Sequence, residues 1–324
     1  MPASERAALK RLAFKLGLAL CLLAALGAWL EGEARRAPTS FRQKRLALEA
    51  QAPDLQVLVL GPSVGLNAVD PARWRLHGYN LANNGQSLYY DRALLEQWLP
   101  RLPRLRAVLF SLGRPNLCVT VTSMNESARG FAYRREFGIP HEDAALRSDP
   151  RNYSAALALD PFKVLCWAVN GGGLVLSDLS PSGWEPLPPL DETQQMLQLS
   201  ALVARKHADH QRAMMVEAPG YGLGQMESML ALCRARGLRA AVFVPPVTRD
   251  FAAQSEAGRP AELGALKALC RANGAVFHDY FRDPRFQDGD FADVDHLAAP
   301  AAGRFSGILE KDLLSGLRPD TATR

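Results

Sequence analysis

Short apolar runs alternate with longer amphipathic segments over most of the chain, and this alternation is the first guide to its fold. Apolar runs that predict buried strands occur at 55–60, 107–112, 242–244 and 275–277. Amphipathic helical patterns precede the last three runs, and two of these patterns end at a glycine. Helix followed by strand, repeated in this way, predicts an α/β fold: a flavodoxin-like three-layer sandwich with a central parallel sheet.

The N-terminus has a different pattern. Residues 16–30 carry no charge, and with the preceding turn from Leu12 they make a helix of about 28 Å, close to a bilayer core of about 30 Å. The basic residues before this run are also typical of a signal peptide, but a small-x-small cleavage site is poorly matched. We therefore favour one retained transmembrane helix over a cleaved signal. Basic residues on both sides of the run leave its orientation open.

These patterns predict the organisation of the chain. Residues 1–31 are expected to form a membrane anchor, 32–52 a polar linker helix, 53–316 the α/β domain and 317–324 a tail. Within the domain, residues 113–218 break the helix–strand rhythm with Gly- and Pro-rich stretches and predict an insertion. The insertion is either a lid or substrate platform, or a passive surface elaboration.

Composition narrows the possible functions. With 324 residues, of which 48% are hydrophobic and 22% charged, the chain is neither disordered nor fibrous in character. The net charge of +5 comes from 38 basic and 33 acidic residues spread along the chain, so we expect a solvated surface and no nucleic-acid partner. Five cysteines show no metal-ligand spacing, although a disulfide stays open. We expect no metal and no organic cofactor.

The candidate chemistry lies at the two ends of the domain. Ser63 follows the first predicted strand directly, within Gly61-Pro-Ser-Val-Gly65, where the carboxyl ends of parallel strands form a ligand crevice. Asp293 stands three residues before His296. A serine hydroxyl needs an imidazole to accept its proton and a group to orient that imidazole, and these three residues can supply all of these parts.

Each of these residues also suits a structural role. Ser63 fits a turn or a helix N-cap, and His296 fits a helix cap. Asp293 competes with Asp290 and Asp295 in an acidic loop that is otherwise solvated or binds a cation. The pair of histidines at 207 and 210 lacks a third ligand, so we expect an exposed helix face there instead of a metal site.

Gly61-Pro-Ser-Val-Gly65 satisfies the G-x-S-x-G pattern of α/β-hydrolases, but that fold places its serine after several strands and its acid on a separate loop. The chain instead resembles the SGNH or GDSL-type hydrolases. Gly61-Pro-Ser63 is similar to their first block, Asn80-Leu-Ala-Asn-Asn-Gly85 to their second, and Asp293 with His296 to their last. The resemblance covers roughly residues 55–115 and 238–312. Residues 80–91 look especially like membrane-anchored members associated with O-acylation of cell-envelope polysaccharides.

The resemblance implies further site residues. The backbone N–H groups of Ser63 and Gly85 would bind the oxyanion. The third block, normally Gly-x-Asn, appears as Gly113-Arg-Pro-Asn116 with one residue too many, so either Asn116 reaches the site through a remodelled loop or Asn83 and Asn84 substitute for it. Pro62 replaces the usual residue before the nucleophile and removes one backbone N–H.

The resulting expectation is a membrane-anchored serine esterase or O-acyltransferase with a Ser63–His296–Asp293 triad, acting on acyl esters of cell-envelope glycans. By resemblance it is located at a bacterial inner membrane with a periplasmic domain. Its partners would be an acylated glycan or acyl donor and a membrane-bound O-acyltransferase. The alternative is an inactive SGNH-like scaffold that assists such an acyltransferase. An ordinary lipase or esterase is a third interpretation.

Overall fold

A five-stranded parallel sheet forms the centre of the computed structural model, which describes residues 3–159, 161–170, 179–215, 219–255 and 259–317. The strand order β2-β1-β3-β4-β5 confirms the predicted flavodoxin-like α/β fold. All but the first residue of the predicted tail lie outside the described residues. The strands are β1 (Val57–Leu60), β2 (Gly78–Asn80), β3 (Ala107–Ser111), β4 (Arg239–Val244) and β5 (Val276–Asp279).

Four of the strands coincide with the predicted apolar runs, and β2 was not predicted. Every residue of β1 and β3 is buried because helices cover both faces of the sheet, which explains their unbroken apolar sequences. In the register of the sheet, Val59 of β1 lies beside Asn80 of β2 and Leu109 of β3. The strand β2 has only three residues, Gly-Tyr-Asn, and its sequence carries no apolar run that could reveal it.

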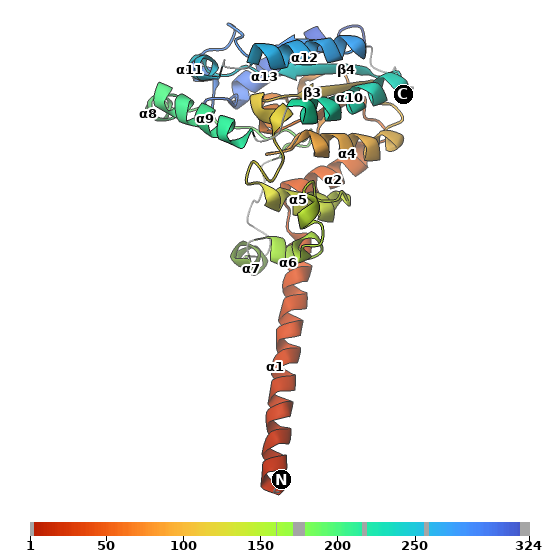
Figure 1. The fold of residues 1–324 in the computed structure, drawn as a ribbon, viewed down its shortest axis with the longest axis vertical. Helices are drawn as coiled ribbons and strands as arrows, with labels where there is room; N and C mark the ends of the chain where they lie inside the picture. Colours follow the sequence, from red (N-terminus) through yellow and green to blue (C-terminus); the bar gives the residue numbers. More distant parts are fainter. Residues whose placement is uncertain (1–2, 160, 171–178, 216–218, 256–258, 318–324) are drawn as a thin grey trace.

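The helices divide into two layers around the sheet (Figure 1). Leu58 and Leu60 of β1 point into a cluster with α2, α4, α10 and α12, whereas Val57 and Val59 point into a cluster with α3 and α13. This alternation is the two-residue period of a strand. The helices are α1 (Ala3–Arg36), α2 (Ser40–Gln51), α3 (Ser63–Ala68), α4 (Leu88–Trp98), α5 (Ser127–Phe137), α6 (Ala155–Ala158), α7 (Pro161–Val169), α8 (Glu192–Gln198), α9 (Ala201–Met214), α10 (Pro219–Ala235), α11 (Arg249–Gln254), α12 (Arg259–Ala272) and α13 (Ala299–Leu313).

The helix α1 projects from the body as one long rod (Figure 1). By length and composition it is able to span a membrane, and its most apolar window is not buried against the rest of the protein. Residues 32–36 still belong to α1, and residues 40–51 form α2. The region predicted as a single linker helix therefore contains parts of two helices.

The long segment between β3 and β4 is mostly helical. It begins with the 3-10 helix η3 (Arg114–Cys118), continues through α5, α6, α7, α8 and α9, and returns to the sheet through α10. Of these, α9 packs against α11 and η3, and α10 packs against α4. Cys233 on α10 and Cys270 on α12 are buried and unpaired. The segment thus brings one helix, α9, toward the carboxyl end of the sheet.

Candidate active site

The turn after β1 delivers Ser63 to the start of a helix. Gly61 has φ +136°, and a Cβ there would lie 2.4 Å from the carbonyl oxygen of Ser111, so only glycine fits. Pro62 is the N-cap of α3 and Ser63 is its first residue. A residue at the first position of a helix has no intrahelical acceptor for its N–H. The Ser63 N–H is therefore available to a ligand.

The side chain of Asn80, at the end of β2, holds α3 in place. Its Nδ2 donates to the carbonyl oxygens of Val69 at 2.8 Å and Gly65 at 3.0 Å, and its Oδ1 accepts from the N–H of Ala82 at 3.0 Å. Asn80 is fully buried. Because buried amides with all partners satisfied are rigid, Asn80 sets the position of α3 and so of Ser63.

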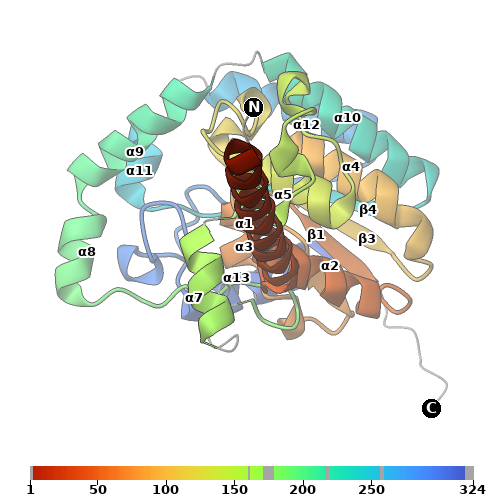
Figure 2. The same cartoon turned by 90° about the horizontal axis from the view of Figure 1, so that it is seen from below.

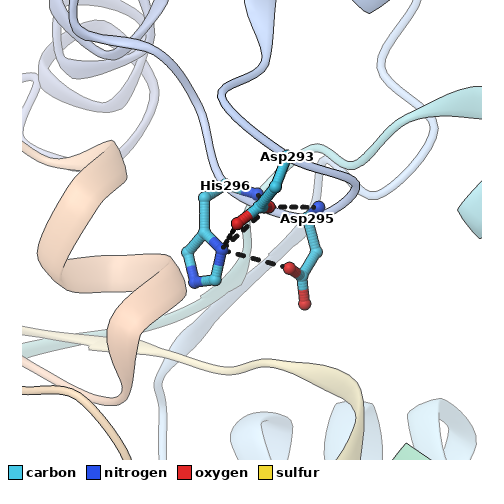
Figure 3. Close-up of side chains that lie close together, drawn as sticks. All are labelled: Asp293, Asp295 and His296. Atoms are coloured by element: carbon cyan, nitrogen blue, oxygen red, sulfur yellow. Dashed lines mark hydrogen bonds and ion pairs between the residues drawn. The ribbon is translucent and has the colours of Figure 1, made fainter. Parts of the chain in front are cut away.

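His296 lies between Ser63 and Asp293. Its Nε2 is 2.8 Å from the Oγ of Ser63. Its Nδ1 is 2.8 and 2.9 Å from the two carboxylate oxygens of Asp293 (Figure 3). A carboxylate only accepts hydrogen bonds, so the neutral ring carries its proton on Nδ1 and Nε2 is free to accept from the serine hydroxyl. The structure brings the three residues together in the order that a nucleophile, a base and an orienting acid require.

A second carboxylate, Asp295, was not predicted to take part. Its Oδ1 is 3.1 Å from Nδ1 of His296 but lacks the alignment of a hydrogen bond. Its Oδ2 accepts from Nε2 of His207 at 3.1 Å and from Nε2 of Gln211 at 3.0 Å, both on α9. The expectation of an exposed helix face is therefore wrong for His207, because α9 packs over the loop that holds His296. The available signal in the sequence was the spacing of His207 and Gln211, which lie one helical turn apart and so share a face of α9.

The charges around His296 shift three pKa values. Burial alone would lower the pKa of His296, but the carboxylates of Asp295 and Asp293 outweigh it and raise the pKa well above its ordinary value. Burial likewise opposes the shift of Asp295, whose pKa the two histidines hold far below its ordinary value. The pKa of His207 is raised by its hydrogen bond to Asp295, against its own burial. The two carboxylates therefore stabilise the charged imidazolium that forms when His296 accepts a proton.

The resemblance implied two backbone N–H groups, those of Ser63 and Gly85, as oxyanion donors. In the described part of the chain, no hydrogen bond uses the N–H of Ser63 or of Gly85. Gly85 has φ +59° in a turn closed by a bond from Gln86 N to Asn83 O at 3.1 Å. A second bond, from Asn83 N to Gly61 O at 3.1 Å, ties this turn to the turn that holds Ser63. The two donors thus belong to connected loops.

The asparagines differ in their freedom to bind a substrate. Asn116, in η3, is buried, and its Oδ1 accepts from the N–H of Gly113 at 2.5 Å. Its Nδ2 makes no hydrogen bond to the described residues and is free to donate to a ligand. The Oδ1 of Asn83 accepts from the N–H of Asn84 at 3.0 Å, so Asn83 shapes the turn, and Asn84 is half-buried.

A third carboxyl group, Asp91, lies beneath the nucleophile turn. It is fully buried on α4, accepts from Nε2 of Gln86 at 2.6 Å and from the N–H of Gly61, and Gln86 in turn accepts from the hydroxyl of Tyr133 at 2.5 Å. Burial raises the pKa of Asp91 to about 7 despite these hydrogen bonds. A buried polar chain therefore supports Gly61, two residues before Ser63.

Asp293, Asp295 and His296 also form a group whose ligand atoms lie within 4.8 Å of one another. Such a group has the donor types and the spacing to hold a cation. His296 Nδ1 would have to give up its proton to bind the ion. The neutral ring would then carry its proton on Nε2, which could no longer accept from the hydroxyl of Ser63.

Comparison with known proteins gives a structural likeness only. No protein-family model matches the chain, and no curated protein matches it. A candidate acylhydrolase of Bacteroides fragilis NCTC 9343 is 12% identical with a TM-score of 0.39, covering 86% of this chain and 96% of that one. A candidate platelet activating factor of Streptococcus pneumonia is 11% identical with a TM-score of 0.38, covering 91% and 99%. The function must therefore be inferred from the geometry of the site.

Proposed function

We propose that this protein is a serine ester hydrolase or O-acyltransferase of the SGNH type, with Ser63 as nucleophile, His296 as base and Asp293 as the residue that orients His296. The observation that carries the proposal is the 2.8 Å separation of Ser63 Oγ and His296 Nε2, with Asp293 on the opposite nitrogen. Residues more than two hundred positions apart in the chain meet here. This arrangement has a direct chemical use and no evident structural one.

The reaction proceeds in two halves. Ser63 Oγ attacks the carbonyl carbon of an ester while its proton passes to His296 Nε2, and the N–H groups of Ser63 and Gly85 stabilise the oxyanion. The intermediate collapses, the C–O bond to the alcohol breaks, and His296 returns the proton to the departing alcohol. Ser63 now carries the acyl group. His296 then takes a proton from the incoming nucleophile, which attacks the acyl carbon and releases Ser63.

The identity of that second nucleophile decides between the two activities. Water gives a carboxylic acid, and a sugar hydroxyl gives a new ester. The likeness of residues 80–91 to proteins of polysaccharide O-acylation supports a cell-envelope glycan as donor or acceptor, and a membrane-bound O-acyltransferase as partner. The apolar helix α1 supports attachment to a bacterial inner membrane, with the domain on the periplasmic side.

The experiment is covalent labelling with a fluorophosphonate probe, which reacts with activated serines. Wild-type protein should form one adduct, located at Ser63 by mass spectrometry, and Ser63→Ala should form none. Ser228→Ala is the matched control, because that residue on α10 is exposed and, within the described ranges, its hydroxyl bonds to Gly224 O. Turnover of an aryl acetate should fall by about 10⁴-fold or more in Ser63→Ala. An adduct that persists in Ser63→Ala would contradict the assignment.

The inactive scaffold is the second candidate, and Pro62 favours it. Proline removes one N–H from the turn that supplies oxyanion donors. For a scaffold, the probe should leave Ser63 unmodified in folded protein while binding of an acylated glycan persists. Labelling at Ser63 would exclude this candidate.

A further inference from the structure

The end of the uncharged run in α1 is tied to the helix α6. Glu31 is the first charged residue after that run. Its carboxylate accepts from the hydroxyl of Ser154 at 2.7 Å and from the N–H groups of Ala155 and Ala156 at 3.1 and 3.0 Å. These are the exposed donors at the start of a helix. The contact fixes α6, and the following α7, at the level where the apolar part of α1 ends.

The helix α7 lies across α1. In Figure 1, α7 is seen nearly end on beside the upper part of α1, and in Figure 2 it is seen along its length while α1 is nearly end on. The two axes are therefore roughly perpendicular. If α1 crosses a bilayer, α7 runs parallel to the bilayer surface at the depth of Glu31.

The faces of α7 have distinct roles. Val164 is buried against Ala34 of α1 and Ala155 of α6. Leu165 and Val169 are 41% and 74% exposed, and Phe162 on the same face is 71% exposed. These three residues follow the i, i+3, i+7 spacing of one helical face, more than a third of a turn away from Val164 at about 100° per residue. An apolar face of a short helix is thus left outside the protein core.

We propose that α7 is an interfacial helix whose face of Phe162, Leu165 and Val169 lies in the bilayer surface next to α1. The bilayer is the occupant because α7 packs on α1 at Ala34, about one helical turn beyond the end of the uncharged run, where lipid head groups would lie. Leu157 of the neighbouring α6 is a further exposed apolar side chain, at 60%. Apolar side chains in this position gain free energy by entering the boundary between head groups and acyl chains. The inference rests on the proposed anchoring of α1.

This contact has a consequence for the site. A single transmembrane helix leaves the domain free to tilt about its attachment. A second contact, perpendicular to the first, fixes the tilt and holds the body at one distance from the membrane. The protein would then act on a donor or acceptor that is presented at a set height above the lipid.

The test is depth-dependent fluorescence quenching in full-length protein reconstituted in phosphatidylcholine–phosphatidylglycerol vesicles. Cys118, Cys233 and Cys270 are buried, so only Cys21 and Cys166 are replaced by alanine before a single new cysteine is introduced and labelled with an environment-sensitive dye. The labelled positions are Val169→Cys on α7, Leu20→Cys on α1, and Met196→Cys on α8. Met196 is the matched control: an apolar residue, 79% exposed, far from α1.

The dye at Val169→Cys should lose most of its emission with a quencher placed near the lipid head groups. The dye at Leu20→Cys should respond most to a quencher near the bilayer centre, and the dye at Met196→Cys to neither. Quenching at Leu20→Cys with none at Val169→Cys would overturn the inference and leave the anchor intact. Absence of quenching at Leu20→Cys would overturn the anchor and the inference with it. Concentration-dependent self-quenching at Val169→Cys, without lipid quenching, would assign the face to a second copy of the chain and overturn the inference.

Discussion

Two carboxylates of one loop, Asp293 and Asp295, approach the same nitrogen of His296, but different regions of the molecule hold them in place. Asp293 is held locally: its Oδ1 accepts from the N–H groups of Asp295 and His296 in its own loop. Asp295 is held from a distance, by His207 and Gln211 on α9. The side chain of Asp293 is 44% exposed and that of Asp295 is 6% exposed.

The difference separates orientation from charge. Asp293 makes aligned hydrogen bonds to Nδ1 and so fixes the ring and its tautomer, even though it is half-exposed. Asp295 is not aligned with Nδ1, but its burial leaves its charge poorly screened. Both carboxylates raise the pKa of His296, but the charge of Asp295 has the larger effect and only Asp293 is aligned with Nδ1.

The largest expected effect is that of Asp293→Asn. An amide at this position can present its N–H to Nδ1 and force the proton to Nε2, where it blocks the bond from Ser63. We expect kcat/KM for an aryl acetate to fall by about 10³- to 10⁴-fold. Asp295→Asn is the paired control and should cost far less at alkaline pH. If Asp295→Asn is the more damaging change, the two roles are reversed.

The pH dependence gives the second test. A base must be neutral to accept a proton, so kcat/KM should rise with pH as His296 loses its proton, and the midpoint should lie above the ordinary histidine pKa because that pKa is raised. Asp295→Asn removes the largest charge that favours the protonated ring. Its acid limb should therefore move to lower pH. The measurement is the pH–rate profile, with the His296 ring signals followed by NMR. An unmoved limb would exclude a charge role for Asp295.

A smaller effect is expected on α9. His207→Ala removes one of two donors to the buried carboxylate of Asp295, whereas His210→Ala on the same helix removes an exposed side chain. We expect His207→Ala to reduce kcat/KM about fivefold, equal to about 1 kcal/mol, and to lower the thermal midpoint slightly. His210→Ala should match wild type in both. Equal behaviour of the two variants would mean that α9 does not support the site.

The smallest effect on activity is expected at Asp91, which is buried like Asp295 but hydrogen-bonds to Gln86, and its variant tests folding instead. Its pKa is raised to about 7, so the neutral form is favoured and its contribution to folding, present at low pH, is lost as pH rises from about 4 through 7. Asp91→Asn resembles the neutral form. Its stability relative to wild type, from denaturant titrations at pH 4 and 8, should increase with pH. A constant difference would show that Asp91 does not titrate in this range.

Much of the fold was predictable from the sequence because the determinants are local. An apolar run between helical patterns identifies β1, β3, β4 and β5 as strands without any knowledge of their neighbours in the sheet. β2 was missed because its three residues depend on β1 for their hydrogen bonds. Asn80 could be noted as part of a motif, but its bonds to Gly65 and Val69 exist only when β2 lies beside β1.

In the candidate site, too, the sequence by itself determines the local relations, and the tertiary structure determines the long-range ones. Ser63 after a strand, and Asp293 three residues before His296, are short-range relations, and the chain alone made them candidates. His207 and Asp295 are 88 residues apart, and neither segment contains a sequence pattern that predicts its contact with the other. Only the packing of α9 over the loop of His296 decides it. Burial, and with it the strength of each charge, likewise belongs to the folded protein, because screening by water depends on what covers a side chain.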